Sequence, residues 1–441
     1  MIPGITRGLR RRTAPVAALA VAGLLAISAC GSDSTSGSTA SGASSNDPIT
    51  ISFLSYNYGT PGLGGEGIQN LLDAFKAANP TITVKAEGVA VKDVLTKLRA
   101  DTAAGSPPDV AQIGWSKMAS AYAALPIVPV QDLAPAAEWK SHTAGISQNL
   151  LAAVSDGGKV KAMPFTMSIP TLFYNADLFR KAGLDPDQPP TTIAQIKDAG
   201  LAIKKVGANG AYIAVVDSGK SDYLTQSLVT TNGGSLVGPS GSIALDQKPA
   251  VDALAAVADL TSSGAAPSVA SDAALAAFNK GELGMIVGST AVLASAQKAA
   301  AGKFELRTAG FPGIGTNPAR PTYSGAGLAV LAKDKAHQDA AWKFIKFLSS
   351  EEGFTTIATK MGYLPLRDTV ARKIADTPIG KLLAPPLAQL ATVSPYTFFP
   401  GERASEAVVA LQDNAVAPIV LQGADPQKTL SEVAGKIRSL K

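Results

Sequence analysis

The alternation of apolar and polar residues predicts strands that are each followed by a helix. Residues 49–54 alternate with the period of a strand, and apolar residues spaced three and four apart over 68–75 predict a helix after a glycine-rich loop. A strand over 82–84, a helix over 91–104 and a strand over 110–114 continue the order. Strands that alternate with helices predict parallel pairing and a doubly wound α/β layer.

The same order continues through the second half of the chain. A strand is predicted over 171–174, and the helix after it begins at Asn175, a residue type that caps helix N-termini, and ends at Gly183. The later elements predicted in this way are a helix over 273–280, strands over 284–287 and 325–331, and a helix over 338–348.

The first thirty residues have the pattern of an export signal. Four arginines and no acidic residue precede an apolar run over 14–27, and the run ends in the sequence Ile-Ser-Ala-Cys. Because the run is shorter than the about 20 residues of a membrane-spanning helix, we predict a lipoprotein signal peptide over 1–29. Cys30, the only cysteine of the chain, would then carry the lipid. An unmodified cysteine beside an ordinary cleavage site is the alternative.

Composition changes after the predicted cleavage site. Residues 30–47 are the cysteine followed almost entirely by Gly, Ser, Thr, Ala and Asp, which predicts a flexible tether before a folded part that starts at Pro48. The chain has 39 basic and 34 acidic residues. Without the four signal-peptide arginines the balance is 35 to 34, so charge gives no reason to expect a nucleic-acid partner. The about 390 remaining residues suggest two or three domains.

Catalytic motifs have little support in the sequence. The only histidines are His142 and His337, and the chain has no G-x-S-x-G and no H-E-x-x-H. We therefore expect no enzyme, no metal and no cofactor, and expect His337 on the surface at a helix start. A glycosidase, which needs only a carboxylate pair, and a purely structural surface lipoprotein remain alternatives.

One glycine motif resembles a dinucleotide-binding loop. Residues 62–67 (GLGGEG) satisfy G-x-G-x-x-G after a predicted strand and before a predicted helix, and Glu87 follows at the end of the next strand. However, the first glycine comes about eight residues after the strand instead of in the tight turn that a pyrophosphate needs. An exported protein also has little access to NAD, so we expect no dinucleotide here.

Seven segments, taken in order, resemble the extracellular solute-binding proteins of ABC importers for sugars and polyols, the group that contains maltose-binding and glycerol-3-phosphate-binding proteins. The segments are FKAANP at 75–80, PPDV at 107–110, GKVKAMPF at 158–165, FYNADLF at 173–179, FNKGELGM at 278–285, AWKFIKFL at 341–348 and GYLP at 362–365.

The resemblance implies a two-lobe α/β fold of the periplasmic-binding-protein type, with a hinge and a ligand cleft between the lobes. It places lobe 1 at 48–145 plus 323–361 and lobe 2 at 146–322 plus 362–441. It also implies a non-enzymatic, extracytoplasmic protein, lipid-anchored to the outer face of the cell membrane, that closes on a small carbohydrate and delivers it to a membrane permease.

Aromatic side chains on loops are the first candidates for ligand contacts, because sugar rings stack on flat aromatic faces. Tyr56 and Tyr58 follow the first predicted strand, and Trp115 follows the third, at the carboxyl ends where open α/β sheets bind ligands. Packing inside a lobe is the alternative for each. Trp342 is in phase with core positions of its helix and is expected in the core, whereas Trp139 fits either interpretation.

The resemblance adds five positions that match family ligand contacts: Ser168, Ser289, Gly325, Tyr363 and Arg403. Arg403 could hold a phosphate, a carboxylate or two adjacent hydroxyls, or it could pair with Glu402 or Glu406. Trp115 stands where glycerol-3-phosphate-binding relatives tend to have a carboxylate. This departure favours a mono- or oligosaccharide or an amino sugar, and glycerol 3-phosphate or a glycerophosphodiester remains the alternative ligand.

Overall fold

The computed structural model describes residues 47–59 and 64–440. The predicted signal peptide, Cys30 and nearly all of the predicted tether lie outside these residues. Within them, the longer strands form two mixed sheets, and a short two-stranded ribbon is made by β4 (Ser155–Asp156) and β5 (Lys159–Val160). No helix in the described part of the chain is long and apolar enough to cross a membrane.

The first sheet contains five strands in the order β2-β1-β3-β11-β6. Their bounds are β1 Ile49–Ser55, β2 Ile82–Gly88, β3 Val110–Gly114, β11 Ser324–Val330 and β6 Ala162–Ser168. β1 pairs in parallel with β2 and β3, as predicted, but β11 pairs antiparallel with both β3 and β6. The prediction of parallel pairing is therefore wrong for β11 and β6, because β11 returns from the second sheet instead of following a crossover helix.

The second sheet contains four strands in the order β10-β7-β9-β8. Their bounds are β10 Leu306–Ala309, β7 Pro170–Asn175, β9 Leu283–Ser289 and β8 Asn209–Ile213. β8 and β9 are parallel, whereas β7 is antiparallel to both β9 and β10. The strands predicted over 171–174 and 284–287 are present as β7 and β9, and parallel pairing holds for one pair of this sheet, β8 with β9.

The chain crosses between the two sheets directly after β6. β6 ends at Ser168 and β7 begins at Pro170, so one residue separates strands of different sheets. The lobe boundary expected at 145/146 placed β6 with the second lobe, whereas its seven residues are buried in the first sheet. β6 lies in the first sheet because its backbone pairs with β11. Since β11 lies about 160 residues further along the chain, no local sequence pattern indicates this pairing.

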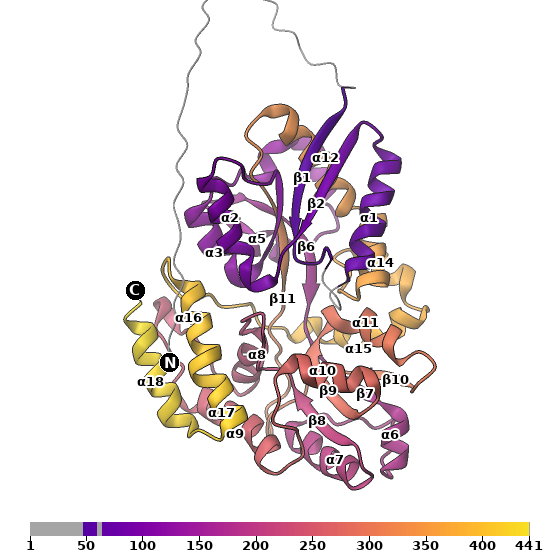
Figure 1. The fold of residues 1–441 in the computed structure, drawn as a ribbon, viewed down its shortest axis with the longest axis vertical. Helices are drawn as coiled ribbons and strands as arrows, with labels where there is room; N and C mark the ends of the chain where they lie inside the picture. The colour runs from indigo at the N-terminus through magenta and orange to yellow at the C-terminus, as the bar shows by residue number, and fades with distance from the viewer. Residues whose placement is uncertain (1–46, 60–63, 441) are drawn as a thin grey trace, which may run out of the picture. The chain divides into compact units, whose positions relative to one another are not determined.

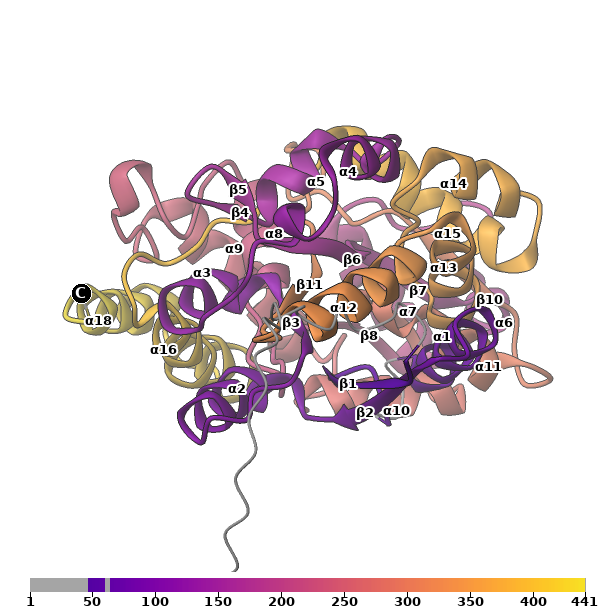
Figure 2. The same ribbon diagram turned by 90° about the horizontal axis from the view of Figure 1, so that it is seen from above.

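Seven helices follow or accompany the first sheet (Figures 1 and 2). They are α1 Gly65–Ala78, α2 Val94–Ala103, α3 Trp115–Ala124, α4 Ala136–Thr143, α5 Gln148–Ala153, α12 Lys335–Leu348 and α13 Glu351–Thr356. α1 buries Phe75, whose ring contacts Phe344 of α12 with centroids 5.0 Å apart, and Phe53 of β1 contacts the same ring at 5.2 Å. The predicted amphipathic face of α1 therefore packs into the core of this sheet.

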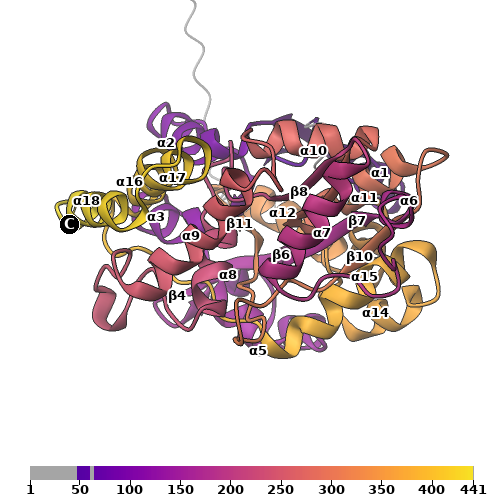
Figure 3. The same ribbon diagram turned by 90° about the horizontal axis from the view of Figure 1, so that it is seen from below.

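The remaining helices accompany the second sheet and the C-terminal part (Figures 1 and 3). They are α6 Ala176–Lys181, α7 Ile193–Lys205, α8 Tyr223–Thr231, α9 Lys248–Ser262, α10 Ser271–Lys280, α11 Leu293–Ala300, α14 Asp368–Ile374, α15 Pro378–Ala388, α16 Ala404–Leu411, α17 Ala417–Gln422 and α18 Pro426–Arg438. Asn175 caps α6 as predicted, since its side-chain oxygen accepts bonds from the Asp177 and Leu178 amides.

The structure also tests the predictions made for Trp139, Trp342 and His337, which lie on α4 and α12. Trp342 is buried in the core as expected, and its ring lies 5.9 Å from that of Trp139. Its indole nitrogen donates to Glu138 at 3.0 Å. His337 lies in the first turn of α12, where its backbone amide donates to Asp334, and its side chain is partly exposed as predicted.

Candidate functional site

A buried chain of polar side chains lies at the carboxyl ends of β1 and β3. Ser55 Oγ donates to Gln112 Oε1 at 2.6 Å, and Gln112 Nε2 donates to Asn57 Oδ1 at 2.5 Å. Asn57 Nδ2 then donates to the hydroxyl group of Tyr363 at 3.1 Å. The sequence analysis found Tyr363 but missed the other three, although a glutamine in the middle of the apolar strand Val110–Gly114 was a signal for them.

Tyr56 and Tyr58 differ in their surroundings. Tyr56 is buried, and burial raises the pKa of its phenol. The neighbouring Tyr363 is buried too, and its own burial raises its pKa to about 12. Tyr58 is half-buried, and its carbonyl oxygen lies so close to Gly88 that a Cβ there would be 2.5 Å away. Tyr56 therefore lies in the core beside the polar chain, while Tyr58 keeps part of its ring accessible.

Trp115 lies at the first position of α3, directly after β3. Its side chain is 2% exposed, and its ring meets that of Tyr323 edge-on with centroids 5.2 Å apart. The indole N–H is buried and has no hydrogen-bond partner among the described residues. Buried donors are nearly always paired in folded proteins, so this group is a candidate for a bond to a bound molecule.

The second sheet contributes a similar unpaired group near two of the predicted serines. The hydroxyl of Tyr223, at the start of α8, is buried and has no partner among the described residues. Burial raises the pKa of Tyr223, and the side chains of Ser289 and Ser168 oppose this rise, so both serines lie close to the phenol. Ser289 Oγ also accepts a bond from the Ala291 amide at 3.1 Å. The sequence analysis missed Tyr223.

Gly325 has a packing role that needs no ligand. It lies opposite Met167 where β11 pairs with β6, and a Cβ at this position would lie 1.9 Å from the carbonyl oxygen of Thr166. Only glycine fits so close an approach of two backbones. The next residue pair, Ser324 and Ser168, joins the same two strands at the crossing point.

Two charged residues are buried near the starts of α3 and α8, the lysine Lys117 and the aspartate Asp222. Lys117, in the first turn of α3, is 7% exposed and has no hydrogen bond or ion pair with any described residue. Burial lowers the pKa of its ammonium, and the carboxyl groups of Asp222 and Asp217 oppose this. Asp222 is fully buried and accepts bonds from Tyr396 Oη at 2.5 Å and Gln226 Nε2 at 3.0 Å.

Arg403 does not join these groups. Its side chain is exposed at the start of α16, and its Nε donates to Glu406 at 3.0 Å. The ion pair with Glu406, which was the alternative to a ligand contact, is therefore present in this structure.

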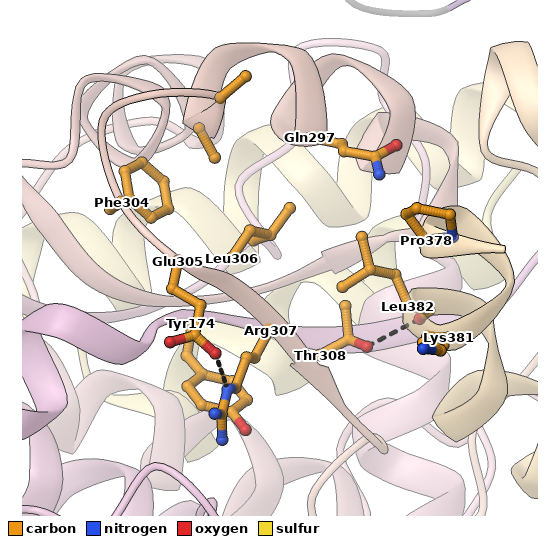
Figure 4. Close-up of a pocket in the computed structure, with 12 residues that line it drawn as sticks. Tyr174, Gln297, Phe304, Glu305, Leu306, Arg307, Thr308, Pro378, Lys381 and Leu382 are labelled. Atoms are coloured by element: carbon orange, nitrogen blue, oxygen red, sulfur yellow. Dashed lines mark hydrogen bonds and ion pairs between the residues drawn. The ribbon is translucent and has the colours of Figure 1, made fainter. Parts of the chain in front are cut away.

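Two cavities are lined by residues other than the predicted site residues. One of about 530 Å³ is bordered by α11, β10 and α15, and Figure 4 shows Glu305 and Arg307 of its lining turned toward one another and joined by a hydrogen bond. The other, of about 380 Å³, is bordered by α5, the loop before α14 and the half-buried ring of Tyr323. Neither is lined by a residue that the sequence analysis selected.

The glycine motif is explained by packing. A Cβ at Gly64 or Gly67 would lie 2.8 or 2.3 Å from side-chain atoms of Met361, so the start of α1 needs glycine to approach that residue. Gly62 lies outside the described residues. The described residues also contain no group of three His, Cys, Asp or Glu side chains that could hold a metal ion.

The chain matches the sequence profile described as "Bacterial extracellular solute-binding protein" over residues 60–353. It is 25% identical over 333 residues to the sn-glycerol-3-phosphate-binding periplasmic protein UgpB of Salmonella typhimurium, covering 72% of this chain and 75% of that protein.

Solved structures share the fold. Mycobacterium tuberculosis UgpB in complex with glycerophosphocholine is similar at a TM-score of 0.74 with 24% identity, covering 89% of this chain and 98% of the other. Maltose-bound MalE3 of T. maritima is similar at a TM-score of 0.76 with 19% identity, covering 89% and 100%. The profile match spans more than half of the chain, and with the two-sheet fold it shows that the chain belongs to the bacterial extracellular solute-binding protein family.

Proposed function

We propose that this protein is the lipid-anchored substrate-binding subunit of an ABC importer and that it captures a carbohydrate between its two sheets. The observation that carries the ligand class is Trp115, a buried indole at the carboxyl end of β3 whose N–H has no partner among the described residues. An indole offers a sugar both a flat apolar surface and a hydrogen-bond donor. A mono- or oligosaccharide or an amino sugar fits these two properties.

Groups from both sheets would contact the ligand in this proposal. Trp115 and Tyr58 follow strands of the first sheet, whereas Ser289 and the Tyr223 hydroxyl, which has no partner among the described residues, belong to the second. A ligand that bonds to both favours the arrangement in which the sheets approach one another, since only that arrangement satisfies both sets of groups. The chain crosses near Ser168, which makes the β6–β7 connection the natural hinge.

A glycerophospho compound is the second candidate ligand. The chain is similar to the glycerol-3-phosphate-binding UgpB of Salmonella typhimurium and to the UgpB of Mycobacterium tuberculosis, whose structure holds glycerophosphocholine. If the ligand is a glycerophospho compound, Arg403 would exchange its exposed bond to Glu406 for a bidentate bond to the phosphate, and the loss of an exposed ion pair costs little because water screens it.

The location of the protein follows partly from the family, whose members work outside the cytoplasm. The anchor itself rests on the sequence, in which an arginine-rich segment and an apolar run precede Cys30. We therefore place the folded part on the outer face of the cell membrane, held by a lipid on Cys30 and by the tether up to residue 47. Replacing Cys30 with alanine should release the protein from the membrane fraction without changing its melting temperature.

Thermal unfolding of the chain from residue 47 onward tests the ligand class. The probes are maltose, maltotriose, N-acetylglucosamine, glycerol 3-phosphate and glycerophosphocholine, and a ligand of the folded state raises the melting temperature. A rise with a saccharide, without release of monosaccharide over hours, supports a non-catalytic carbohydrate binder. A rise with the two phosphate compounds alone supports the second candidate, and no rise with any of the five contradicts the solute-binding proposal.

A further inference from the structure

The buried chain of polar side chains has a hydroxyl group at each end, Ser55 and Tyr363, and two amides between them. Ser55 Oγ donates to Gln112 Oε1, and Gln112 Nε2 donates to Asn57 Oδ1. Asn57 Nδ2 then donates to the Tyr363 hydroxyl oxygen at 3.1 Å. Because each amide has one donating and one accepting end, only one of the two hydroxyl groups can donate into the chain. The other must accept, and its own hydrogen remains for a different partner.

Burial decides which hydroxyl group donates. Ser55 is fully buried, and its oxygen also accepts a bond from the Asn57 backbone amide at 3.1 Å. If the bonds ran in the opposite direction, the Ser55 hydrogen would have no acceptor among the described residues, and a buried donor without an acceptor is costly. Ser55 therefore donates into the chain, and the hydroxyl group of Tyr363 at the other end accepts.

The hydrogen of the Tyr363 hydroxyl group is left without an acceptor. Tyr363 is 3% exposed, and the only hydrogen bond of its hydroxyl group within the described part of the chain is the one that it accepts from Asn57. Folded proteins nearly always pair a buried donor. A buried hydroxyl hydrogen that no described residue accepts therefore indicates an acceptor supplied by a bound molecule.

The backbone holds Tyr363 where the two sheets meet. The residue before it, a glycine, packs so closely that its Cβ would lie 3.2 Å from the carbonyl oxygen of Thr290, which directly follows Ser289. The amide of the residue after it donates to the carbonyl oxygen of Met167 at 2.9 Å, and Met167 directly precedes Ser168. Tyr363 is thus fixed between the chain neighbours of the two serines of the candidate site.

The direction of the chain decides which ligand group fits. A hydroxyl group that accepts a bond from an amide is a better donor, because the bonds in a chain polarise one another. A sugar hydroxyl or a glycosidic oxygen has the lone pair that such a donor needs. The ammonium group of a protonated amino sugar has hydrogens only, so it would face the Tyr363 hydrogen without a lone pair to offer.

We propose that Gln112 and Asn57 act as positioning residues that fix the Tyr363 hydroxyl group as a hydrogen-bond donor to the ligand. Ser55 sets the direction of their bonds. The site therefore selects an oxygen acceptor of a neutral carbohydrate at this position and rejects a charged amino group there. This proposal deepens the proposed function and rests on it, since it narrows the ligand to a carbohydrate whose oxygen meets Tyr363.

Isothermal titration with the saccharide that gives the largest thermal shift tests the donor. Tyr363→Phe removes the hydroxyl group and should weaken binding about tenfold. Asn57→Asp should weaken it too, because a carboxylate has no hydrogen to donate and would itself accept the Tyr363 hydrogen. Since Asn57 acts on the ligand through this hydroxyl group, the double variant should bind within about twofold of Tyr363→Phe, whereas independent structural losses would multiply.

Analogues of the saccharide report the direction of the bond, which a loosened fold would not change. Two analogues are made at each hydroxyl position, one with fluorine, which can only accept, and one with an ammonium group, which can only donate. In the wild-type protein the fluorine analogue should bind more tightly at the position that meets Tyr363. Asn57→Asp should move the ratio of the two affinities there about tenfold toward the ammonium analogue. Asn209→Asp makes the same change at the exposed start of β8, opposite Leu283 and at the other end of β9 from Ser289, and should leave every ratio unchanged.

If Asn57→Asp does not fold, Gln112→Glu provides the second variant. Its two carboxylate oxygens accept from Ser55 and Asn57, which turns the Asn57 oxygen toward Tyr363. A ratio that neither variant shifts at any position, or Tyr363→Phe binding within about twofold of wild type, overturns the proposal and leaves the proposed function intact. Wild-type protein that binds no saccharide at all contradicts the proposed carbohydrate function, and with it this proposal.

Discussion

The side-chain amide of Asn57 donates a hydrogen bond to the hydroxyl group of Tyr363 at 3.1 Å, and the two residues are 306 positions apart in the chain. Asn57 follows β1 of the first sheet, whereas Tyr363 follows Gly362, whose position a Cβ could not occupy because it would lie 2.7 Å from the Ala294 amide of α11. The bond therefore ties the end of β1 to the segment that packs against the second sheet.

Removing the Tyr363 hydroxyl should destabilise the protein. Tyr363→Phe keeps the ring but removes a buried hydrogen bond, and such a bond contributes about 0.5–1.5 kcal/mol to stability. Urea unfolding followed by circular dichroism measures the loss. Tyr58→Phe is the matched control, since Tyr58 is half-buried and its hydroxyl makes no hydrogen bond with described residues. Equal stability of both variants would contradict the importance of the bond.

Substituting the glycines at the start of α1 tests the packing explanation of the glycine motif. Gly67→Ala places a Cβ 2.3 Å from Met361 Cγ, so Met361 must move, at a cost of about 1–3 kcal/mol. Gly435→Ala is the control, because nothing lies within 4 Å of a Cβ there and alanine favours a helix such as α18. We expect this control to be neutral or stabilising in thermal unfolding.

The same experiment addresses the dinucleotide alternative. If the loop served a dinucleotide, NAD would raise the melting temperature of the wild-type protein and Gly67→Ala would abolish the rise. We expect no rise in either protein, since the two described glycines of the motif are already explained by their contact with Met361.

His142 should make stability fall in mild acid. Burial, followed by the charges of Arg367 and Lys346, lowers its pKa to about 4, although Glu138 opposes the shift. Between pH 6.5 and 4 the unfolded chain therefore binds a proton that the folded chain does not, so acid favours unfolding over this window. Above pH 6.5 both states are neutral at this residue and the effect is absent.

The two histidines of the chain act in opposite directions and control for one another. His142→Gln should reduce the loss of stability between pH 7 and 5 in urea unfolding. Asp334 raises the pKa of His337, so this residue stabilises the fold below pH 6.5 and the contribution disappears as pH rises through the raised value. His337→Gln should therefore steepen the loss in acid. Parallel pH profiles for both variants would contradict these assignments.

Local patterns were sufficient to predict single elements. The spacing of apolar residues in α1, the Asn175 cap and the core position of Trp342 depend on neighbours within a few turns, and all three are confirmed. The membership of β6 in the first sheet was not predictable in this way, because it is set by pairing with β11 far along the chain.

The site was predicted less completely than the fold, for a related reason. Trp115, Ser168 and Ser289 were selected, whereas Lys117 and Asp222 have no distinctive sequence context. Both are buried, and burial is defined only by the folded chain. A lysine at the third position of a helix is usually on the surface, and the sequence offered no reason to expect Lys117 inside.

Tryptophan fluorescence should report carbohydrate binding through Trp115 alone among the three tryptophans. Trp139 and Trp342 contact one another between α4 and α12, whereas Trp115 meets Tyr323 beside the unpaired groups of the candidate site. A saccharide stacked on the indole and bonded to its N–H should change the emission intensity and wavelength of the wild-type protein. Trp115→Phe should abolish the change and weaken saccharide binding at least tenfold, while Trp139→Phe should retain both the change and the affinity. If Trp115→Phe retains the affinity measured by isothermal titration, Trp115 packs inside the first lobe and the ligand contacts must come from Tyr58 and the second sheet.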